Sequence, residues 1–271
     1  MYRMKKKLVG FIGAGNMASA IIGGIRSAGI YEDSQLFVFD VNHCKMAEMK
    51  ELGLHTAASA QELVQVCDIV FLAVKPQNFE EVLTEICSAV TESTLFVTIA
   101  AGISTSYIRS KTTKDCQVIR AMPNTPLLLG LGATALCRTE NVPDTVFEEV
   151  KKIFETSGIV EIIEERQMNE IISVNGSSPA YVYVFVKALV DGAKAYGIDS
   201  DVALRLVAQT LTGSAKMLLE SGKTPDELIQ MVSSPGGTTL AALNVLEKEG
   251  FSATLRRAMD SCTARAEELG R

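Results

Sequence analysis

The amino-acid sequence predicts an α/β Rossmann-type doubly wound domain followed by an all-α domain. Up to about Glu165, short β-branched runs alternate with helical patterns, and this alternation is typical of a parallel sheet wound by helices. Beyond that residue the strand-like runs stop, and capped helices follow one another. We therefore expect two domains, at residues 1–164 and 165–271.

Composition narrows the possible functions. The 271 residues are 47% hydrophobic, contain no apolar run long enough to cross a bilayer and carry a net charge of −6, which disfavours membrane and nucleic-acid partners. The six cysteines are scattered and form no CxxC pair, so we expect no metal site. The first apolar run leads directly into a glycine loop that signal-peptide cleavage would destroy, and we expect a cytoplasmic protein.

The first predicted strand, residues 7–12, runs into a glycine-spaced turn and then a helix that starts near Met17. Gly13 permits a tight turn, Gly15 lets backbone N–H groups approach a pyrophosphate, and the small Ala18 lets helix and strand pack closely. An ordinary glycine turn is the alternative. The predicted cofactor-binding residues of this loop are Gly13, Ala14, Gly15, Asn16, Met17 and Ala18.

The second strand ends at Asp40, at a suitable distance from the glycine loop to hydrogen-bond an adenosine ribose. An acid there favours NADH, whereas Asn42 and Lys45 could accommodate a 2′-phosphate, so NADH and NADPH both stay open. In the alternative, Asp40 merely begins the next turn. The strands are predicted at residues 7–12, 35–39, 68–74, 94–99, 117–121, 133–137 and 159–163.

Three further strand ends carry candidate ligand contacts, because ligands of open parallel sheets bind outside the carboxyl ends of the strands. A proline after the third strand fixes a turn past the cofactor, and small residues after the fourth allow a flat nicotinamide ring to lie against backbone. Asn124 lies between two prolines that hold its amide toward a ligand, or it belongs to a plain turn. The cofactor-binding residues predicted here are Ala73, Val74, Lys75, Pro76, Ala100, Ala101 and Gly102.

Helices of the second domain are predicted at residues 178–197, from 199 or 200 to about 221, from a capping box at Thr224, at 239–249 and from 252 onward. The segment 181–190 is apolar on nearly every face. One small helical domain does not readily bury such a helix, so we expect an all-α dimerisation domain that forms a homodimer. A central helix in a monomer's bundle is the alternative.

A second glycine turn, residues 232–239, precedes the fourth of these helices. Its bare backbone and the N–H groups of the following helix suit a carboxylate, and Ser234 adds a hydroxyl. In the alternative interpretation, Thr239 only caps the following helix. The polar turn that contains Ser177 either faces the same cleft or caps its own helix. The substrate-binding residues predicted are Ser234, Gly236, Gly237, Thr238, Ser177 and Asn124.

The only histidines, His43 and His55, lie in the first domain, so the second offers no histidine as a proton donor. Lys187 or Lys194 remains possible, although Lys187 is spaced to pair with Asp191. A protonated imine, which accepts hydride with little acid help, meets this requirement. A β-hydroxyacid dehydrogenase and a non-catalytic nucleotide sensor are the competing interpretations.

Almost end to end, the chain resembles the pyrroline-5-carboxylate reductase family, in residues 11–17, 73–76, 99–102, 120–126, 176–181, 213–217 and 233–239. The last segment is specific to that family. The resemblance implies an oxidoreductase that reduces a cyclic imine, 1-pyrroline-5-carboxylate, to L-proline by hydride transfer from NAD(P)H, as the last step of proline biosynthesis. It also implies an interlocked homodimer, sometimes stacked into larger rings.

By the same resemblance, Thr239 is the catalytic residue and would hydrogen-bond the ring nitrogen. Ser234 and the backbone of residues 236–238 would hold the substrate carboxylate. The family commonly favours NADPH, but many members carry a hydroxyl residue where this chain has Asp40. The cofactor is therefore expected to be NADPH or NADH.

Overall fold

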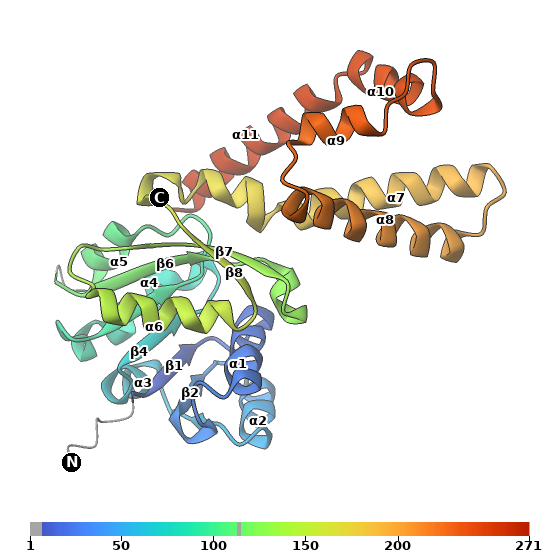
Figure 1. Cartoon of the computed structure of the whole chain (residues 1–271). Coiled ribbons are helices and arrows are strands. Elements are labelled where there is room, and N and C mark those ends of the chain that lie inside the picture. Colours follow the sequence, from blue (N-terminus) through green and yellow to red (C-terminus); the bar gives the residue numbers. More distant parts are fainter. Residues whose placement is uncertain (1–6, 113–114, 271) are drawn as a thin grey trace. The chain divides into compact units, whose positions relative to one another are not determined.

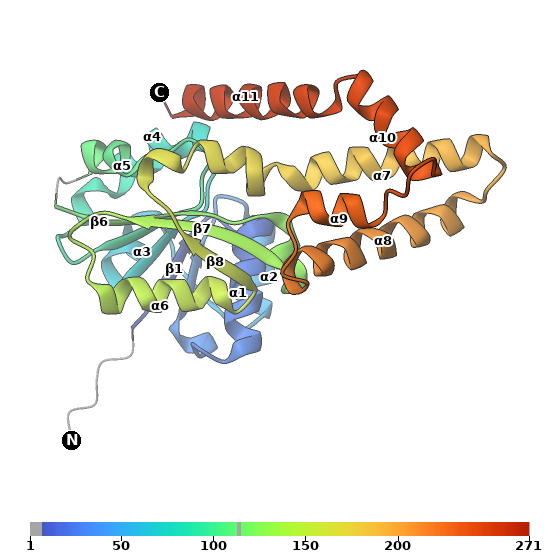
Figure 2. The same cartoon turned by 45° about the horizontal axis from the view of Figure 1, so that its top comes forward.

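The computed structural model describes residues 7–112 and 115–270, and in them an eight-stranded sheet with the order β3-β2-β1-β4-β5-β6-β7-β8 (Figures 1 and 2). The predicted strands are confirmed within a few residues, and the two-residue β3 was not predicted. The strands are β1 (Val9–Ile12), β2 (Leu36–Phe39), β3 (His55–Thr56), β4 (Ile69–Leu72), β5 (Leu95–Thr98), β6 (Gln117–Met122), β7 (Gly132–Arg138) and β8 (Gly158–Ile162).

The strand directions depart in part from the expected parallel sheet. β1 to β6 are parallel, with registers such as Gly10 beside Phe37 and Val70, but β7 pairs antiparallel with β6 and parallel with β8. The short connection from β6 to β7, only residues 123–131, cannot carry a crossover helix, and this accounts for the reversal. The strand ends predicted to bind ligand, on β1, β2, β4, β5 and β6, therefore share one edge.

Helices cover both faces of the sheet. Apolar side chains of α1 and α6 pack on one face around Phe11 and Phe71, whose rings stack 4.5 Å apart. Those of α3, α4 and α5 pack on the other around Phe96. The helices of this part are α1 (Asn16–Ala28), α2 (His43–Glu51), α3 (Ala60–Val66), α4 (Phe79–Ile86), α5 (Thr105–Lys111) and α6 (Asp144–Glu155).

Five further helices follow the sheet in sequence, close to their predicted positions. Thr224 and Glu227 form the predicted capping box, and Lys187 pairs with Asp191 as expected. The five helices are α7 (Ser178–Ala195), α8 (Ser200–Glu220), α9 (Pro225–Met231), α10 (Thr238–Lys248) and α11 (Phe251–Leu269).

The chain divides into compact units at other positions than the expected boundary between residues 164 and 165. Among the described residues, 178–261 form the helical unit, whereas those before 178 and after 261 belong with the sheet. The difference arises because residues 165–177 and the end of α11 pack on β6 and β7, where Met122, Met168 and Ala266 share a small apolar cluster.

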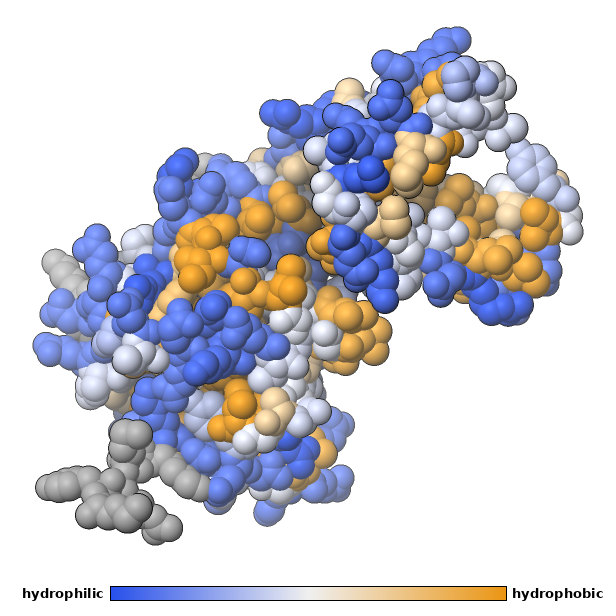
Figure 3. All heavy atoms as spheres, in the orientation of Figure 1, coloured by the Kyte–Doolittle hydropathy of each residue, from blue (hydrophilic) through white to orange (hydrophobic). Residues whose placement is uncertain are grey.

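The helical unit does not bury a core of its own. Within residues 178–261, all of which are described, Ala203 alone is fully buried. Apolar side chains of α7 face outward, with Tyr183 63% and Val184 70% exposed, and Figure 3 shows hydrophobic atoms over the α7–α8 pair. The alternative of a central helix in a monomer's bundle is therefore wrong.

Candidate active site

The glycine loop follows β1 and is held against two neighbouring strands. Gly13 has φ +103° and donates its N–H to Phe39 O, 2.7 Å away. A Cβ on Gly13 would lie 2.6 Å from Ala73 O, so any side chain here would collide with the end of β4. The first glycine is thus required both by its backbone conformation and by close packing.

Beyond Gly13 the loop opens. A Cβ on Gly15 would meet nothing within 4 Å, and α1 starts after Gly15 with no side-chain cap, so its first N–H groups face open space. Ala18, 1% exposed, packs in the core below. These features fit the pyrophosphate of a dinucleotide, which a helix N-terminus with free N–H groups binds.

Asp40 is joined to the glycine loop. One carboxylate oxygen accepts the Ala14 N–H at 2.8 Å and lies 3.6 Å from Lys45 Nζ, and the other accepts the Asn42 N–H. The Asn42 side chain caps α2 by accepting from the N–H groups of Cys44 and Lys45. Asp40 therefore reaches the predicted cofactor loop, while Asn42 already has a structural role.

The end of β4 lies beside the same loop. Ala73 donates its N–H to Ile12 O at 2.8 Å, and Pro76 begins a short 3₁₀ turn that Lys75 precedes. The structure thus brings Gly13, Ala14, Asp40 and Ala73 together at one edge of the sheet, as the sequence predicts.

Gly102, after β5, is required to be a glycine by contacts within the protein, and its expected contact with nicotinamide stays a prediction. It has φ +82°, and a Cβ on it would lie 2.3 Å from Ala266 O and 3.1 Å from Gly270 N. The end of α11 occupies that side of the residue. Ala100, which is 5% exposed, leaves only its backbone for contact with a ligand.

We expect Gly102→Ala to destabilise the protein more than Gly130→Ala. Both glycines have positive φ, which costs an L-residue about 1–2 kcal/mol, but a Cβ on Gly130 would meet nothing within 4 Å. The packing against α11 should add about 1–3 kcal/mol. Thermal unfolding followed by circular dichroism measures the difference, and equal losses of stability would contradict the role of α11.

The Asn124 amide is held in one orientation, as expected, but by protein groups. Its Oδ1 accepts the Ala133 N–H at 2.9 Å and its Nδ2 donates to Asn175 O at 3.2 Å. Asn175 Nδ2 in turn donates to Met122 O and Ala133 O. Asn124, 9% exposed, therefore fastens residues 165–177 to the sheet, and its role in binding substrate stays a prediction.

The second glycine turn lies between α9 and α10. Gly237 donates its N–H to Ser234 O at 3.0 Å, and Pro235 and Gly236, with φ +74°, occupy the centre as in a type II turn. A Cβ on Gly237 would lie 2.6 Å from Ser234 Oγ. The turn is therefore tight, and its two glycines leave backbone exposed, as carboxylate binding by backbone requires.

The residue that precedes α10 is Gly237, and no side chain caps this helix. Thr238 and Thr239 are its first two residues, so the interpretation of Thr239 as a helix cap is wrong. Among the described residues, the Thr239 hydroxyl has no hydrogen-bond partner. The free N–H groups and this hydroxyl are available to a ligand.

Ser177 lies at the start of α7. Its Oγ is 3.3 Å from Cys262 Sγ, which can donate to it, and its N–H binds Ile172 O. The contact with Cys262 joins the two chain segments that flank the helical unit.

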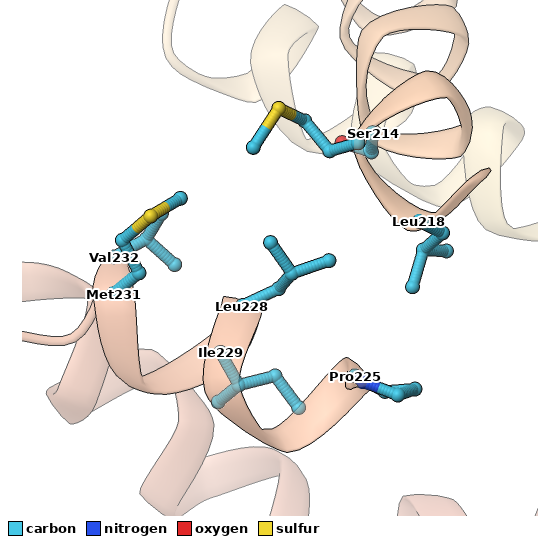
Figure 4. A pocket seen from close by; sticks show the side chains of 8 residues that line it. Ser214, Leu218, Pro225, Leu228, Ile229, Met231 and Val232 are labelled. Atoms are coloured by element: carbon cyan, nitrogen blue, oxygen red, sulfur yellow. The ribbon is translucent and has the colours of Figure 1, made fainter. Parts of the chain in front are cut away.

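An apolar cavity of about 330 Å³ separates α8 from α9, just before the second glycine turn (Figure 4). Ser214 supplies its one polar side chain. The remaining lining residues are Met217, Leu218, Pro225, Leu228, Ile229, Met231 and Val232. Within the described ranges, no cluster of His, Cys, Asp and Glu could hold a metal ion, and no helix is long and apolar enough to span a membrane.

In comparison with known proteins, two different families match the two ends of the chain. Residues 8–102 match a family described as NADP oxidoreductase coenzyme F420-dependent, and residues 165–269 match one described as pyrroline-5-carboxylate reductase dimerisation. The pyrroline-5-carboxylate reductase of Escherichia coli (strain K12) is 41% identical over 269 residues, 99% of this chain and 100% of that protein. The chain belongs to the pyrroline-5-carboxylate reductase family.

Solved reductases of this family share the whole fold. The Plasmodium falciparum pyrroline carboxylate reductase, solved with NADP bound, superposes with a TM-score of 0.90 at 32% identity, covering 99% of this chain and 100% of that chain. The Streptococcus pyogenes enzyme gives 0.89 at 33% identity, covering 97% and 98%. The predicted fold class is confirmed.

Sequence reasoning missed a group of polar residues at the end of the reductase sheet. Arg120, Glu165, Asn169 and Asn175 hold residues 165–177 on β6 and β7. The available signal was Arg120 itself, a single charge in the otherwise apolar centre of a predicted strand.

Proposed function

We propose that the chain reduces the cyclic imine 1-pyrroline-5-carboxylate to L-proline, using NAD(P)H as the hydride donor. The observation that carries this proposal is the Ser234–Gly237 turn, which leaves an uncapped helix N-terminus and a free Thr239 hydroxyl side by side. A hydroxy-acid substrate would need a proton donor, and the helical unit has no histidine to supply one.

The residues of the chain hold the reactants at two places. The N–H groups at the start of α1, after Gly15, would bind the pyrophosphate, because Asp40 already accepts the Ala14 N–H. Ala14 to Ala18 and the ends of β4 and β5 would complete the cofactor site. The backbone of residues 236–238 and Ser234 bind the substrate carboxylate, and Thr239 orients the ring nitrogen. The dinucleotide supplies the hydride that the imine carbon accepts.

Oxidation of NADH and NADPH in the presence of 1-pyrroline-5-carboxylate tests the reaction. Turnover of the cyclic imine supports the proposal. Turnover of hydroxy acids alone would favour a β-hydroxyacid dehydrogenase, and dinucleotide binding without any turnover would favour a nucleotide sensor.

We further propose that NADH serves as well as NADPH. The Asp40 carboxylate, fixed by the Ala14 N–H, is positioned to accept from the adenosine ribose, and its charge opposes a 2′-phosphate, while Lys45 at 3.6 Å offsets part of that charge. The Plasmodium falciparum relative was solved with NADP bound, and this supports use of the phosphorylated form as well.

Asp40→Ser should raise kcat/KM for NADPH relative to NADH by about tenfold, because one unfavourable charge contact of about 1.4 kcal/mol is removed. Initial rates with both dinucleotides measure the ratio. Asp68→Ser is a matched control, since Asp68 likewise accepts a backbone N–H, that of Leu8, at the opposite end of the sheet. An unchanged ratio in the Asp40 variant would show that Asp40 does not contact the ribose.

We propose that the active form of the protein is a homodimer that assembles through the helical unit. A groove of about 660 Å³ runs between α7 and the pair α10–α11, and it is lined almost wholly by apolar side chains such as Val184, Phe185 and Leu255. A second copy would bury this surface and supply the core that one copy lacks. Larger rings and a cytoplasmic location remain predictions.

A further inference from the structure

Arg120, on β6, is a buried cation with few partners. Its side chain is 2% exposed; Nη2 donates to Asn169 Oδ1, and Nη1 lies 3.5 Å from Glu165 Oε1. Within the described residues, Nε has no hydrogen-bond partner. Burial lowers the pKa of Arg120 and Glu165 opposes this shift, so the free energy of the buried charge depends on Glu165.

Glu165 contacts two further parts of the sheet unit. Its Oε1 also accepts the Thr105 N–H at 3.0 Å, and its Oε2 accepts from Cys137 Sγ at 3.4 Å. Thr105 is the first residue of α5 and lies three positions after Gly102. The carboxylate therefore ties the segment that leads into α7 to the loop between β5 and α5.

That loop contains Ala100, Ala101 and Gly102, the residues expected to lie against the nicotinamide ring. We propose that Arg120 and Glu165 are positioning residues for hydride transfer: Arg120 fixes the Glu165 carboxylate, which sets the loop through the Thr105 N–H. This inference rests on the proposed function. Neither residue contacts a reactant, and their effect is on the geometry of the reacting pair, to which rates are sensitive.

Glu165→Gln removes the charge that holds Arg120 and preserves the shape of the side chain. We expect kcat to fall about tenfold while KM for the dinucleotide changes less than about twofold, because the glycine loop is untouched. A merely structural role would lower the melting temperature and leave kcat of the folded enzyme unchanged, which would overturn the proposal.

Thr105→Pro provides a variant that does not leave Arg120 unpaired. Thr105 occupies the first helical position, where proline is tolerated, and Ser104 before it is extended with ψ 160°. The substitution removes the N–H that Glu165 accepts, together with the buried Thr105 side chain, and the same fall in kcat is expected. Lys111→Met is the control. Lys111 lies at the far end of α5 from the loop, and the substitution breaks its ion pair with Glu80 of α4. The kcat of this variant should stay unchanged.

Alkylation of Cys137 gives a readout that does not depend on activity. Burial and then Glu165 raise the pKa of this thiol to about 12, so the native protein should react slowly with iodoacetamide. In Glu165→Gln, labelling of Cys137, located by mass spectrometry, should be several-fold faster. An unchanged labelling rate would contradict the contact between Glu165 and Cys137. If the native protein reduces no imine, the proposed function fails, while the labelling still tests the contact.

Discussion

Val184→Glu is expected to convert the protein into a monomer with little or no activity. Val184 is 70% exposed in one copy and lines the groove between α7 and α10–α11. In a homodimer the new carboxylate would be buried among apolar side chains without a partner, at a cost of several kcal/mol. Because residues 178–261 bury almost no core alone, loss of the partner should also loosen the turn that carries Thr239.

Light scattering at micromolar concentration measures the mass, and imine-dependent oxidation of the dinucleotide measures activity. Val66→Glu is the matched control: Val66 ends α3, is 40% exposed and lies in the sheet unit. It should remain a dimer with full activity. A native protein of monomer mass, or an active dimer in the Val184 variant, would contradict the assignment of this groove to a second copy.

The sequence predicts well those features that depend on short segments. Strands such as β4 are runs of four buried apolar residues, and the glycine loop combines a required backbone conformation with a required small size at Gly13. The helical starts at Ser178 and Thr224 depend on local proline and capping patterns, and they too are confirmed. Local physical chemistry is sufficient in each case.

Contacts between residues far apart in the chain could not be predicted in the same way. The contact of Gly102 with the end of α11 joins residues more than 160 positions apart in the chain. The sequence therefore suggested only a ligand contact for this glycine. The hydrogen bonds of Asn124 to Ala133 and Asn175 form only once the chain has folded. The sequence therefore suggested a substrate contact or a plain turn for this residue and not these bonds. In both cases a small or polar residue beside an expected site fits a ligand and a structural contact equally well.

Thr239→Ala is expected to lower kcat by one to two orders of magnitude, equivalent to about 1.4–2.7 kcal/mol of transition-state stabilisation. The hydroxyl has no partner among the described residues, so its removal should leave the helical unit as stable as before. Its position on the second residue of α10 places it next to N–H groups that can hold a carboxylate. A loss of activity without a loss of stability would therefore report a contact with the substrate.

Two further substitutions at the same position separate shape from hydrogen bonding. Thr239→Val retains the volume without the hydroxyl and should be as slow as the alanine variant, whereas Thr239→Ser retains the hydroxyl and should keep most of the activity. Since the carboxylate is bound elsewhere in the turn, KM for the imine should change less than kcat in all three variants. Native kinetics in Thr239→Val would remove this hydroxyl from the reaction and leave the backbone of residues 236–238 to hold the substrate alone.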